Sequence, residues 1–311
     1  MILVCGGLAD LVIELVCARI EACGYPYRLL DLGFYPQGYS VSWQWEGLYP
    51  TGYISSEQWR LGLEEISGLF IRYPSPKQTA RREDLPSELS DSVHMECNLQ
   101  LSVLVEHLPC LVANRLAGGT SNHSKTYQAL HVRSCGLKTP STLVTTDPEA
   151  ALRFYEEHAG EVIYKSLSGI RSIVRRLVPD ELQRLQLLRH GPAQFQEFIP
   201  GVNVRVHTVG GELFATMVHS EAVDYRFAEV EGEHVYMEPF SLPPDIAEAC
   251  LRLAGRLDLL IAGIDFKLTP EGEYYCFEIN PAPAFSYYEQ HTGQPISEAL
   301  ANVLHRGVIA A

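Results

Sequence analysis

Two apolar segments near the C-terminal end of the chain constrain its fold most, because each carries oxygen-bearing side chains within a hydrophobic run. Residues 261–268 and 274–279 have the length and composition of strands, and a turn with a proline and a glycine separates them, so they are predicted to form a hairpin. Side chains alternate along a strand, which places Glu278 and Asn280 on one face. Asp265, on the neighbouring strand, can face the same side.

This hairpin carries the ligand types of a divalent cation site. Burying two carboxylates among apolar residues is costly unless a cation pairs with them. Magnesium prefers hard oxygen ligands, few protein carboxylates, and phosphate oxygens for the remainder. The sequence therefore predicts that Asp265, Glu278 and Asn280 hold Mg²⁺ beside a phosphate group. A half-exposed hairpin whose polar side chains face solvent shows the same alternation, so spacing alone leaves that alternative open.

Lys165 is a second candidate because it lies in an apolar strand, residues 162–166. A lysine in such a strand favours an anionic partner. The small residues that follow, 166–169, can fold over a phosphate and donate backbone N–H groups. An exposed lysine on an edge strand is the ordinary alternative.

Residues 194–199 form a further apolar strand, which stops at Pro200 and Gly201. Backbone donors and acceptors at the end of such a strand are free to read the edge of a purine between apolar walls. On its own the pattern is that of any strand followed by a turn. His207 and His219 lie on the next strands, where a purely structural histidine is the more common case than a general base or a substrate contact.

The first 116 residues predict a parallel α/β domain. Strand 1–6, helix 8–23 and strand 27–32 follow one another, and this order is typical of parallel sheets. A glycine-rich linker at 117–121 ends the domain. Within it we also expect an aromatic hairpin at 38–60, strands at 68–73 and 111–114, a loop at 75–92 and a helix at 93–108.

The remaining residues alternate between helices and strands. Asp147 and Pro148 make a strong helix start, because aspartate caps the helix and proline suits its first turn. Gly210 and Gly211 predict a tight hairpin turn. Predicted helices span 124–135, 147–159, 244–258 and 294–306, and a strand is predicted at 142–145. The region 162–219 reads as almost all strand, with strands at 162–166, 172–177, 194–199, 202–209 and 212–219.

Composition limits the partners of the chain. There are 38 acidic and 24 basic residues, a formal net charge of −14, which disfavours nucleic acids and membrane surfaces as partners. The eight cysteines contain no C-x-x-C pair and are typical of reduced, buried cysteines in a cytosolic protein. Neither a signal peptide nor an apolar run of ~20 residues is evident. We therefore expect a soluble, cytoplasmic protein that binds no nucleic acid and no membrane.

In their order along the chain, these segments resemble the ATP-grasp superfamily, and within it the RimK-like ligases of peptides and glutamate. The resemblance runs from about residue 120 to 305, and the first 115 residues match as a pre-grasp domain. It is carried by Lys125 at a helix start, residues 136–145, Lys165 with its glycine loop, the segment Gln196-Glu197-Phe198-Ile199, residues 204–211, and Asp265, Glu278 and Asn280.

The resemblance implies a fold and a domain organisation. The expected fold is the ATP-grasp fold, of α/β class with α+β lobes. It has a parallel pre-grasp domain at 1–116, a small lobe at 117–192 with a hinge at 193–200, and a large C-terminal lobe at 201–311 that carries the magnesium site.

It also implies an ATP-dependent ligase that phosphorylates a carboxylate and lets an amine, less often a hydroxyl, attack the acyl phosphate. ATP and one or two Mg²⁺ ions, with Mn²⁺ as an alternative metal, are the implied cofactors. Arg205 and Arg226 would stabilise the transferring phosphoryl group. The implied nucleotide ligands are Lys125 and Lys165 at the phosphates, Gln196, Glu197, Phe198 and Ile199 at the adenine, and Asn203, where RimK-like ligases often carry an aspartate.

Residues 222–226 and 292–296 are similar to segments of ligases that cyclise ribosomal peptides through ω-ester or ω-amide bonds. After Pro281 those cyclases usually continue with asparagine, glycine, glutamine and tryptophan, whereas residues 282–285 here are two alanines, a proline and a phenylalanine. We expect a peptide or amino-acid substrate. A peptide macrocyclase and, in another class, a non-catalytic ATP-binding regulatory protein are the alternatives, and a homodimer stays open.

Overall fold

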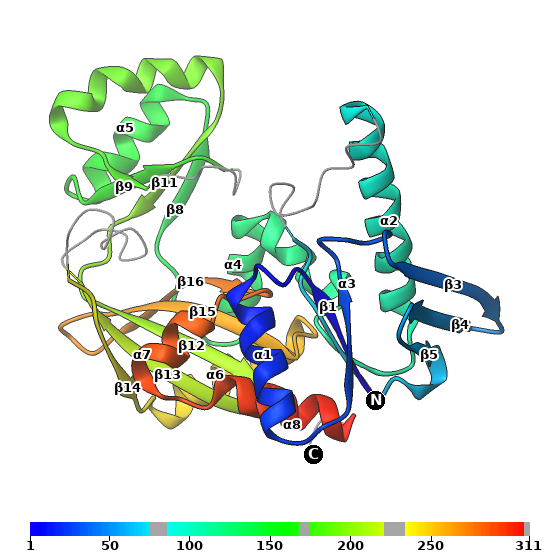
Figure 1. The fold of residues 1–311 in the computed structure, drawn as a ribbon. Helices are drawn as coiled ribbons and strands as arrows, with labels where there is room; N and C mark the ends of the chain where they lie inside the picture. Colours follow the sequence, from blue (N-terminus) through cyan, green and yellow to red (C-terminus); the bar gives the residue numbers. More distant parts are fainter. Residues whose placement is uncertain (75–85, 168–173, 221–233, 308–311) are drawn as a thin grey trace.

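The computed structural model describes residues 1–74, 86–167, 174–220 and 234–307, and Figure 1 shows their arrangement. These residues form one parallel sheet, three antiparallel sheets and the helices that cover them. The mixed α/β class predicted from the sequence is confirmed. Within the described ranges, no helix has both the length and the apolar character needed to cross a membrane.

The N-terminal sheet is parallel, as its strand–helix–strand opening predicts. Its strand order is β2-β1-β6-β7. Helix α1 (Leu11–Ala22) begins after Asp10, whose side chain accepts a hydrogen bond from the Val12 N–H at 2.9 Å and so caps the helix. The strands are β1 (Ile2–Gly6), β2 (Tyr27–Asp31), β6 (Gly68–Ile71) and β7 (Leu111–Ala113).

The aromatic segment forms the expected hairpin and adds a third strand. Strands β3 (Tyr39–Glu46), β4 (Tyr49–Ser56) and β5 (Arg60–Gly62) make a small antiparallel sheet, followed by a short 3₁₀ turn, η1 (Leu63–Glu65). Helix α2 (Ser87–His107) starts six residues earlier than predicted. Its first turns expose Leu89 and Met95, so they show no buried stripe by which a sequence pattern could reveal them.

The small lobe has an antiparallel sheet with the order β10-β9-β11-β8. Two helical segments, α5 (Pro148–Glu157) and η3 (Pro179–His190), pack against each other and cover this sheet. The prediction of nearly continuous strand from 162 to 219 was therefore wrong over η3, which buries only Leu185 and Leu188. The strands are β8 (Thr142–Thr145), β9 (Val162–Lys165), β10 (Arg175–Arg176) and β11 (Ala193–Glu197).

The large lobe contains a five-stranded antiparallel sheet with the order β14-β13-β12-β15-β16. Helix α6 (Pro244–Arg256) covers one face, while α7 (Ser286–Thr292) and α8 (Ile296–Arg306) lie over the other and also contact α1. Both α7 and strand β14 were missed by the sequence patterns. The strands are β12 (Val202–Val209), β13 (Glu212–His219), β14 (Tyr236–Phe240), β15 (Ile261–Leu268) and β16 (Tyr274–Asn280).

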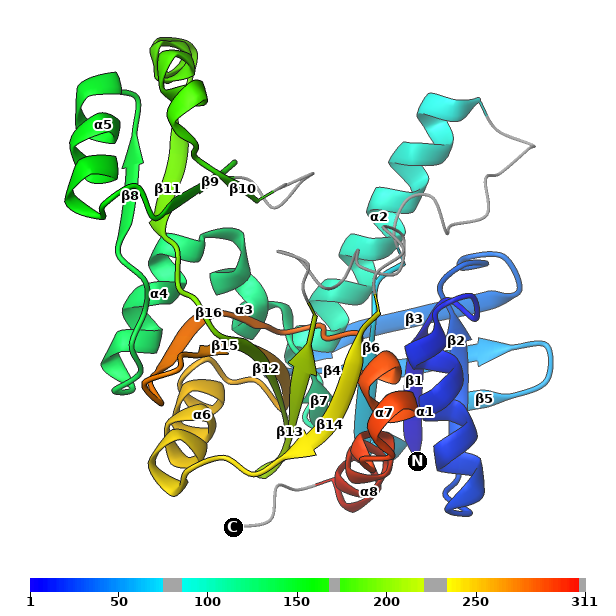
Figure 2. The ribbon, with the colours of Figure 1, turned by 90° about the vertical axis from the view of Figure 1, so that its left-hand side faces the viewer.

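The expected linker at 117–121 is helical. It forms α3 (Leu116–Gly119) and the 3₁₀ turn η2 (Thr120–His123), which lead directly into α4 (Lys125–Ser134). Gly118 allows this compact path, because a Cβ there would lie 2.7 Å from the carbonyl oxygen of Leu257. Figure 2 shows α4 beside β16, with the small lobe standing above this edge of the large sheet.

One hydrophobic core joins the two ends of the chain. Ile2 and Val4 of β1 pack in the same buried cluster as Phe214 of β13 and Leu300 and Leu304 of α8. The contact is close, since a Cβ at Gly68 would lie 2.2 Å from the carbonyl oxygen of Leu304. The N-terminal domain is thus packed onto the same side of the large sheet as α7 and α8.

Candidate functional site

The hairpin of β15 and β16 brings the predicted oxygen ligands to one face. Asp265 lies directly opposite Glu278, and Asn280 lies opposite Gly263. A bulge separates these pairs from the next one, in which Phe266 pairs with Cys276. Phe277 is the extra residue of this bulge. It allows Phe266 and Cys276 to stay buried on the apolar face while Glu278 aligns with Asp265.

Arg205 of β12 completes this face on the other side of β15. It pairs with Asp265 in the strand register, and its Nη1 donates to Asp265 Oδ1 at 2.6 Å. The arginine is only 6% exposed. Gly263 makes room for it, because a Cβ at that position would lie 1.9 Å from Arg205 Nη2. A glycine in the middle of a strand here serves the close approach of a side chain.

Lys125 approaches the same face from the first turn of α4. Its Nζ lies 2.6 Å from Glu278 Oε2. Ser124 caps the helix, since its hydroxyl accepts a hydrogen bond from the Tyr127 N–H. Each of the two carboxylates is therefore paired with a cation from a different element, which is the compensation that clustered carboxylates require.

The place of α4 is fixed by a residue that sequence reasoning missed. Gln128, only 1% exposed, donates from Nε2 to the Ile279 carbonyl at 2.7 Å and accepts from the Ile279 N–H at 3.0 Å. These bonds dock α4 on the outer edge of β16, one residue from Glu278. A glutamine inside a helix gives no sequence signal of this contact.

Asn114 is a second residue without a sequence signal. At the end of β7, its Oδ1 accepts from the N–H groups of Leu260 and Ile261, and its Nδ2 donates to the carbonyls of Ile261 and Pro281 at 2.6 and 2.5 Å. It thus joins the start of β15 to the residue after Asn280. One amide ties the N-terminal domain to both strands of the candidate site.

The small lobe supplies Lys165 and Gln196. Lys165 Nζ donates to Gln196 Oε1 at 3.3 Å, and Gln196 Nε2 donates to Thr142 Oγ1 at 3.1 Å. Gln196 is buried, so its amide orients the lysine from within the sheet. The structure therefore brings these two predicted residues together.

The last residue of β11 and the residue after it have fewer free backbone groups than the sequence suggested. The Glu197 N–H donates to the Ser141 carbonyl and the Phe198 N–H to the Glu161 carbonyl, both at 2.9 Å. A purine cannot use these two donors while they are so engaged. Ile199 is buried at the end of the segment, and the Arg176 guanidinium covers the Phe198 ring at 3.7 Å.

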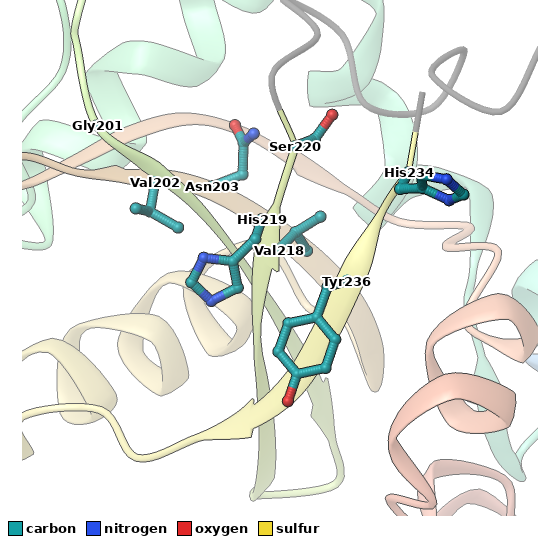
Figure 3. A pocket seen from close by; sticks show the side chains of 8 residues that line it. All are labelled: Gly201, Val202, Asn203, Val218, His219, Ser220, His234 and Tyr236. Carbon is teal, nitrogen blue, oxygen red and sulfur yellow. The ribbon is translucent and has the colours of Figure 1, made fainter. Parts of the chain in front are cut away.

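Asn203 lies on the site face of β12, two residues before Arg205, and lines a cavity of about 380 Å³ (Figure 3). Figure 3 shows its side chain on the opposite side of the sheet from His219 and Tyr236. Among the described residues that line this cavity, Asn203 is the one predicted nucleotide ligand, and Asp265 and Glu278 are not among them. The other predicted arginine, Arg226, lies outside the described residues.

The donor set fits a magnesium ion. Asp265 and Glu278 provide carboxylate oxygens, and Asn280, whose Oδ1 accepts from the Ala282 N–H at 2.9 Å, provides an amide oxygen. Among the described residues there is no group of three or more histidine, cysteine, aspartate or glutamate side chains suited to a metal. Two carboxylates are few for an all-protein cage, and they match an ion that takes its remaining ligands from phosphates.

Comparisons with known proteins agree with this geometry. No curated protein matches the chain. Among solved structures, the macrocyclase MdnC bound with precursor peptide MdnA, from Microcystis aeruginosa MRC, is 26% identical with a TM-score of 0.83, covering 99% of this chain and 100% of that one. A RiPP-associated ATP-grasp ligase of Chryseobacterium gregarium, in complex with ADP and a leader and core peptide, is 25% identical with a TM-score of 0.84, covering 100% and 99%.

The ATP-grasp ligase PsnB complexed with minimal precursor, Mg and ADP shares the fold, with 24% identity, a TM-score of 0.78, and coverage of 98% of this chain and 96% of that one. A family model, the RimK-like ATP-grasp domain, matches residues 120–304, more than half of the chain. The chain therefore belongs to the RimK-like ATP-grasp family and is an ATP-grasp ligase.

Proposed function

We propose that this protein joins a carboxylate to an amine of a peptide by way of an acyl phosphate, with ATP and Mg²⁺. One observation carries the proposal. Asp265 and Glu278 lie in register on one face, and each is paired with a cation, Arg205 from β12 and Lys125 from α4. Such a face can hold a metal–triphosphate complex, because it offers oxygen ligands to the metal and cations to the phosphates.

The residues divide the work by charge. Mg²⁺, held by Asp265, Glu278 and Asn280, would neutralise charge on the β- and γ-phosphates. Lys125, from α4 beside β16, and Lys165, from β9 of the small-lobe sheet, would contact phosphate oxygens. Arg205, fixed in its pocket, would stabilise the charge that develops during transfer. Fixed cations stabilise developing charge without reorganising during the reaction.

The reaction has two balanced steps. A substrate carboxylate oxygen attacks the γ-phosphorus, the bond from that phosphorus to the β–γ bridging oxygen breaks, and ADP leaves. The amine nitrogen then attacks the acyl carbon, the carbon–oxygen bond to phosphate breaks, and the amine loses a proton as the amide forms. Closure of the small lobe over the face that carries Asp265 and Glu278 would exclude water from the acyl phosphate.

A peptide is the substrate that the comparisons favour. The structures of MdnC and of the Chryseobacterium gregarium ligase contain precursor, leader or core peptides, and both cover essentially this whole chain, including its N-terminal domain. Macrocyclisation of a ribosomal peptide through side-chain amide or ester bonds is the narrower candidate. The segment 282–285 differs from that group, and in this structure the Pro283 carbonyl accepts a hydrogen bond from Arg72 while Phe285 is buried.

A non-catalytic ATP-binding protein is the less favoured alternative. Such a protein has no physical need for two facing carboxylates, which cost free energy when clustered. We place the reaction in the cytoplasm, where ATP is available and where the eight cysteines, none of which forms a disulfide in the described residues, would stay reduced. We further propose the boundaries 1–116, 117–192 with a hinge at 193–200, and 201–311 for the domains.

The test is ADP release from Mg-ATP against a panel of synthetic acidic peptides with amine-bearing side chains. The wild type should release ADP and give a product lighter than the peptide by one water per bond formed within it. Glu278→Ala should abolish release while the thermal melting curve stays that of a folded protein. Glu273→Ala, on the same hairpin but paired with Lys138 at its exposed end, is the matched control and should stay active. Equal turnover by Glu278→Ala would refute the site.

A further inference from the structure

The proposed chemistry does not use His207, a buried polar side chain next to Arg205. His207 is 0% exposed and lies on the same face of β12 as Arg205, two residues further on. Its ring meets Tyr288 edge to face, with centroids 4.8 Å apart, and also contacts Phe285. Burying the His207 imidazole among aromatic side chains costs free energy unless hydrogen bonds within the protein replace those it made to water.

The compensating bond is made to Arg205. The Arg205 Nε donates to His207 Nε2 at 3.3 Å, while Nη1 donates to Asp265 Oδ1 at 2.6 Å. A guanidinium group is planar, so acceptors at two of its nitrogens fix the plane and its rotation. Gly263 adds a third constraint, since only a residue without a side chain leaves space for Nη2.

The bond requires a neutral imidazole. Nε2 accepts, so the ring proton lies on Nδ1, an atom with no hydrogen-bond partner among the described residues. Burial, and then the charge of Arg205, hold the pKa of His207 well below its ordinary value of 6.5. A protonated ring would turn an N–H toward the guanidinium and repel it. A carboxylate here would accept the bond but cancel the charge of Arg205.

We propose that His207 is a positioning residue that holds Arg205 in the orientation needed at the transferring phosphoryl group, a role that rests on the proposed function. The histidine supplies an uncharged acceptor from inside the core. It leaves the positive charge of the arginine available to the phosphates. Asp265 then has to fix only the opposite end of the guanidinium.

The first test measures the bond itself, without nucleotide. The Arg205 Nε–H resonance is observed in protein carrying ¹⁵N-arginine and assigned with Arg205→Lys. His207→Gln places an uncharged acceptor near the position of Nε2, whereas His207→Leu and His207→Met provide none. Hydrogen exchange at Nε should stay slow in the wild type and in His207→Gln. It should be at least about tenfold faster in the Leu and Met variants, because a hydrogen bond from a charged donor is lost.

The second test measures ADP release from Mg-ATP. We expect kcat to fall about 10- to 100-fold in His207→Leu with the KM for Mg-ATP within about threefold of the wild type, because misplacing Arg205 affects the transition state more than binding. His207→Gln should recover most of kcat. His219→Gln, at a half-exposed histidine on β13, is the control and should match the wild type.

Slow exchange in a folded His207→Leu protein would overturn the role, as would a His207→Gln variant no more active than His207→Leu. Absence of ADP release by the wild type would instead overturn the proposed function. It would also remove the proposed role of His207 in orienting Arg205 toward the phosphoryl group. The exchange measurement separates these cases, because it decides whether His207 holds Arg205 when no reaction is measured.

Discussion

Gln128 and Ile279 exchange two hydrogen bonds, so that a helix side chain pairs with the outer edge of β16 as a neighbouring strand would. This relationship places Lys125, three residues earlier on α4, within 2.6 Å of Glu278. The lysine proposed to bind phosphate thus depends for its position on an amide that touches no ligand.

Gln128→Leu should therefore weaken both stability and nucleotide binding. Leaving the buried Ile279 N–H and C=O without partners should cost about 2–3 kcal/mol of unfolding free energy. The KM for Mg-ATP should rise because Lys125 loses its fixed position. Urea unfolding and ADP-release kinetics measure the two effects. Gln183→Leu, at an exposed position of η3, is the control, and an unfolding midpoint for Gln128→Leu equal to that of this control would contradict the expectation.

Gly263→Ala should impair catalysis through Arg205. The new Cβ would lie 1.9 Å from Nη2, so the guanidinium must leave Asp265 and His207. We expect kcat to fall by about 100-fold or more, since a displaced transition-state contact costs about that much. Gly255→Ala is the matched control: a Cβ there meets no atom within 4 Å, and removing a helical glycine should leave activity unchanged and add up to about 1 kcal/mol of stability. Equal kcat values for the two variants would show that the space left by Gly263 for the Arg205 guanidinium is not needed for catalysis.

Asn114→Ala should destabilise the junction between the N-terminal domain and the large lobe. The variant loses four hydrogen bonds to backbone groups of Leu260, Ile261 and Pro281, which we expect to cost about 2–4 kcal/mol. Asn114→Asp should be no better, because a carboxylate keeps the two accepted bonds but faces two carbonyls that need donors. Chemical unfolding compares both with Asn122→Ala, at an exposed position of η2. A change below about 0.5 kcal/mol in the unfolding free energy of Asn114→Ala would show that these four hydrogen bonds do not stabilise the junction.

Cys250 should make stability fall at alkaline pH. Burial raises the pKa of this thiol from 9.0 to about 12. Above pH 9 the unfolded chain releases the proton while the folded chain keeps it, so ionisation favours unfolding, and the stability present below pH 9 is lost as pH rises toward 12. At pH 10 the loss from this one group should be about 1 kcal/mol. Cys250→Ala should flatten the decline by that amount when urea unfolding at pH 8 and pH 10 is compared under reducing conditions; an unchanged slope would show that other groups cause it.

The sequence predicts the candidate site better than it predicts the elements around it. Asp265, Glu278 and Asn280 could be placed on one face because the two-residue period of a strand requires it. The cap at Asp147 and the glycine turn at 210–211 follow from equally local rules, and both are found in the structure.

The missed elements depend on contacts distant in sequence. Segment η3 buries two leucines in twelve residues, so its helical form reflects packing on α5 rather than an apolar stripe. Gln128 and Asn114 act through backbone groups more than 140 positions away, on strands whose pairing no local pattern encodes. The register bulge at Phe277 belongs to the same class, since only the partner strand defines it.

The close approach of Gly68 to α8 has a consequence for how the chain is made. Strand β1 is synthesised nearly three hundred residues before Leu300 and Leu304, which pack against the apolar surface of its sheet. During synthesis this apolar surface of the N-terminal sheet stays exposed until α8 is made, and chaperones or other proteins can bind it. Burial of this surface is therefore a late event in folding, because it requires α8 to pack against β1.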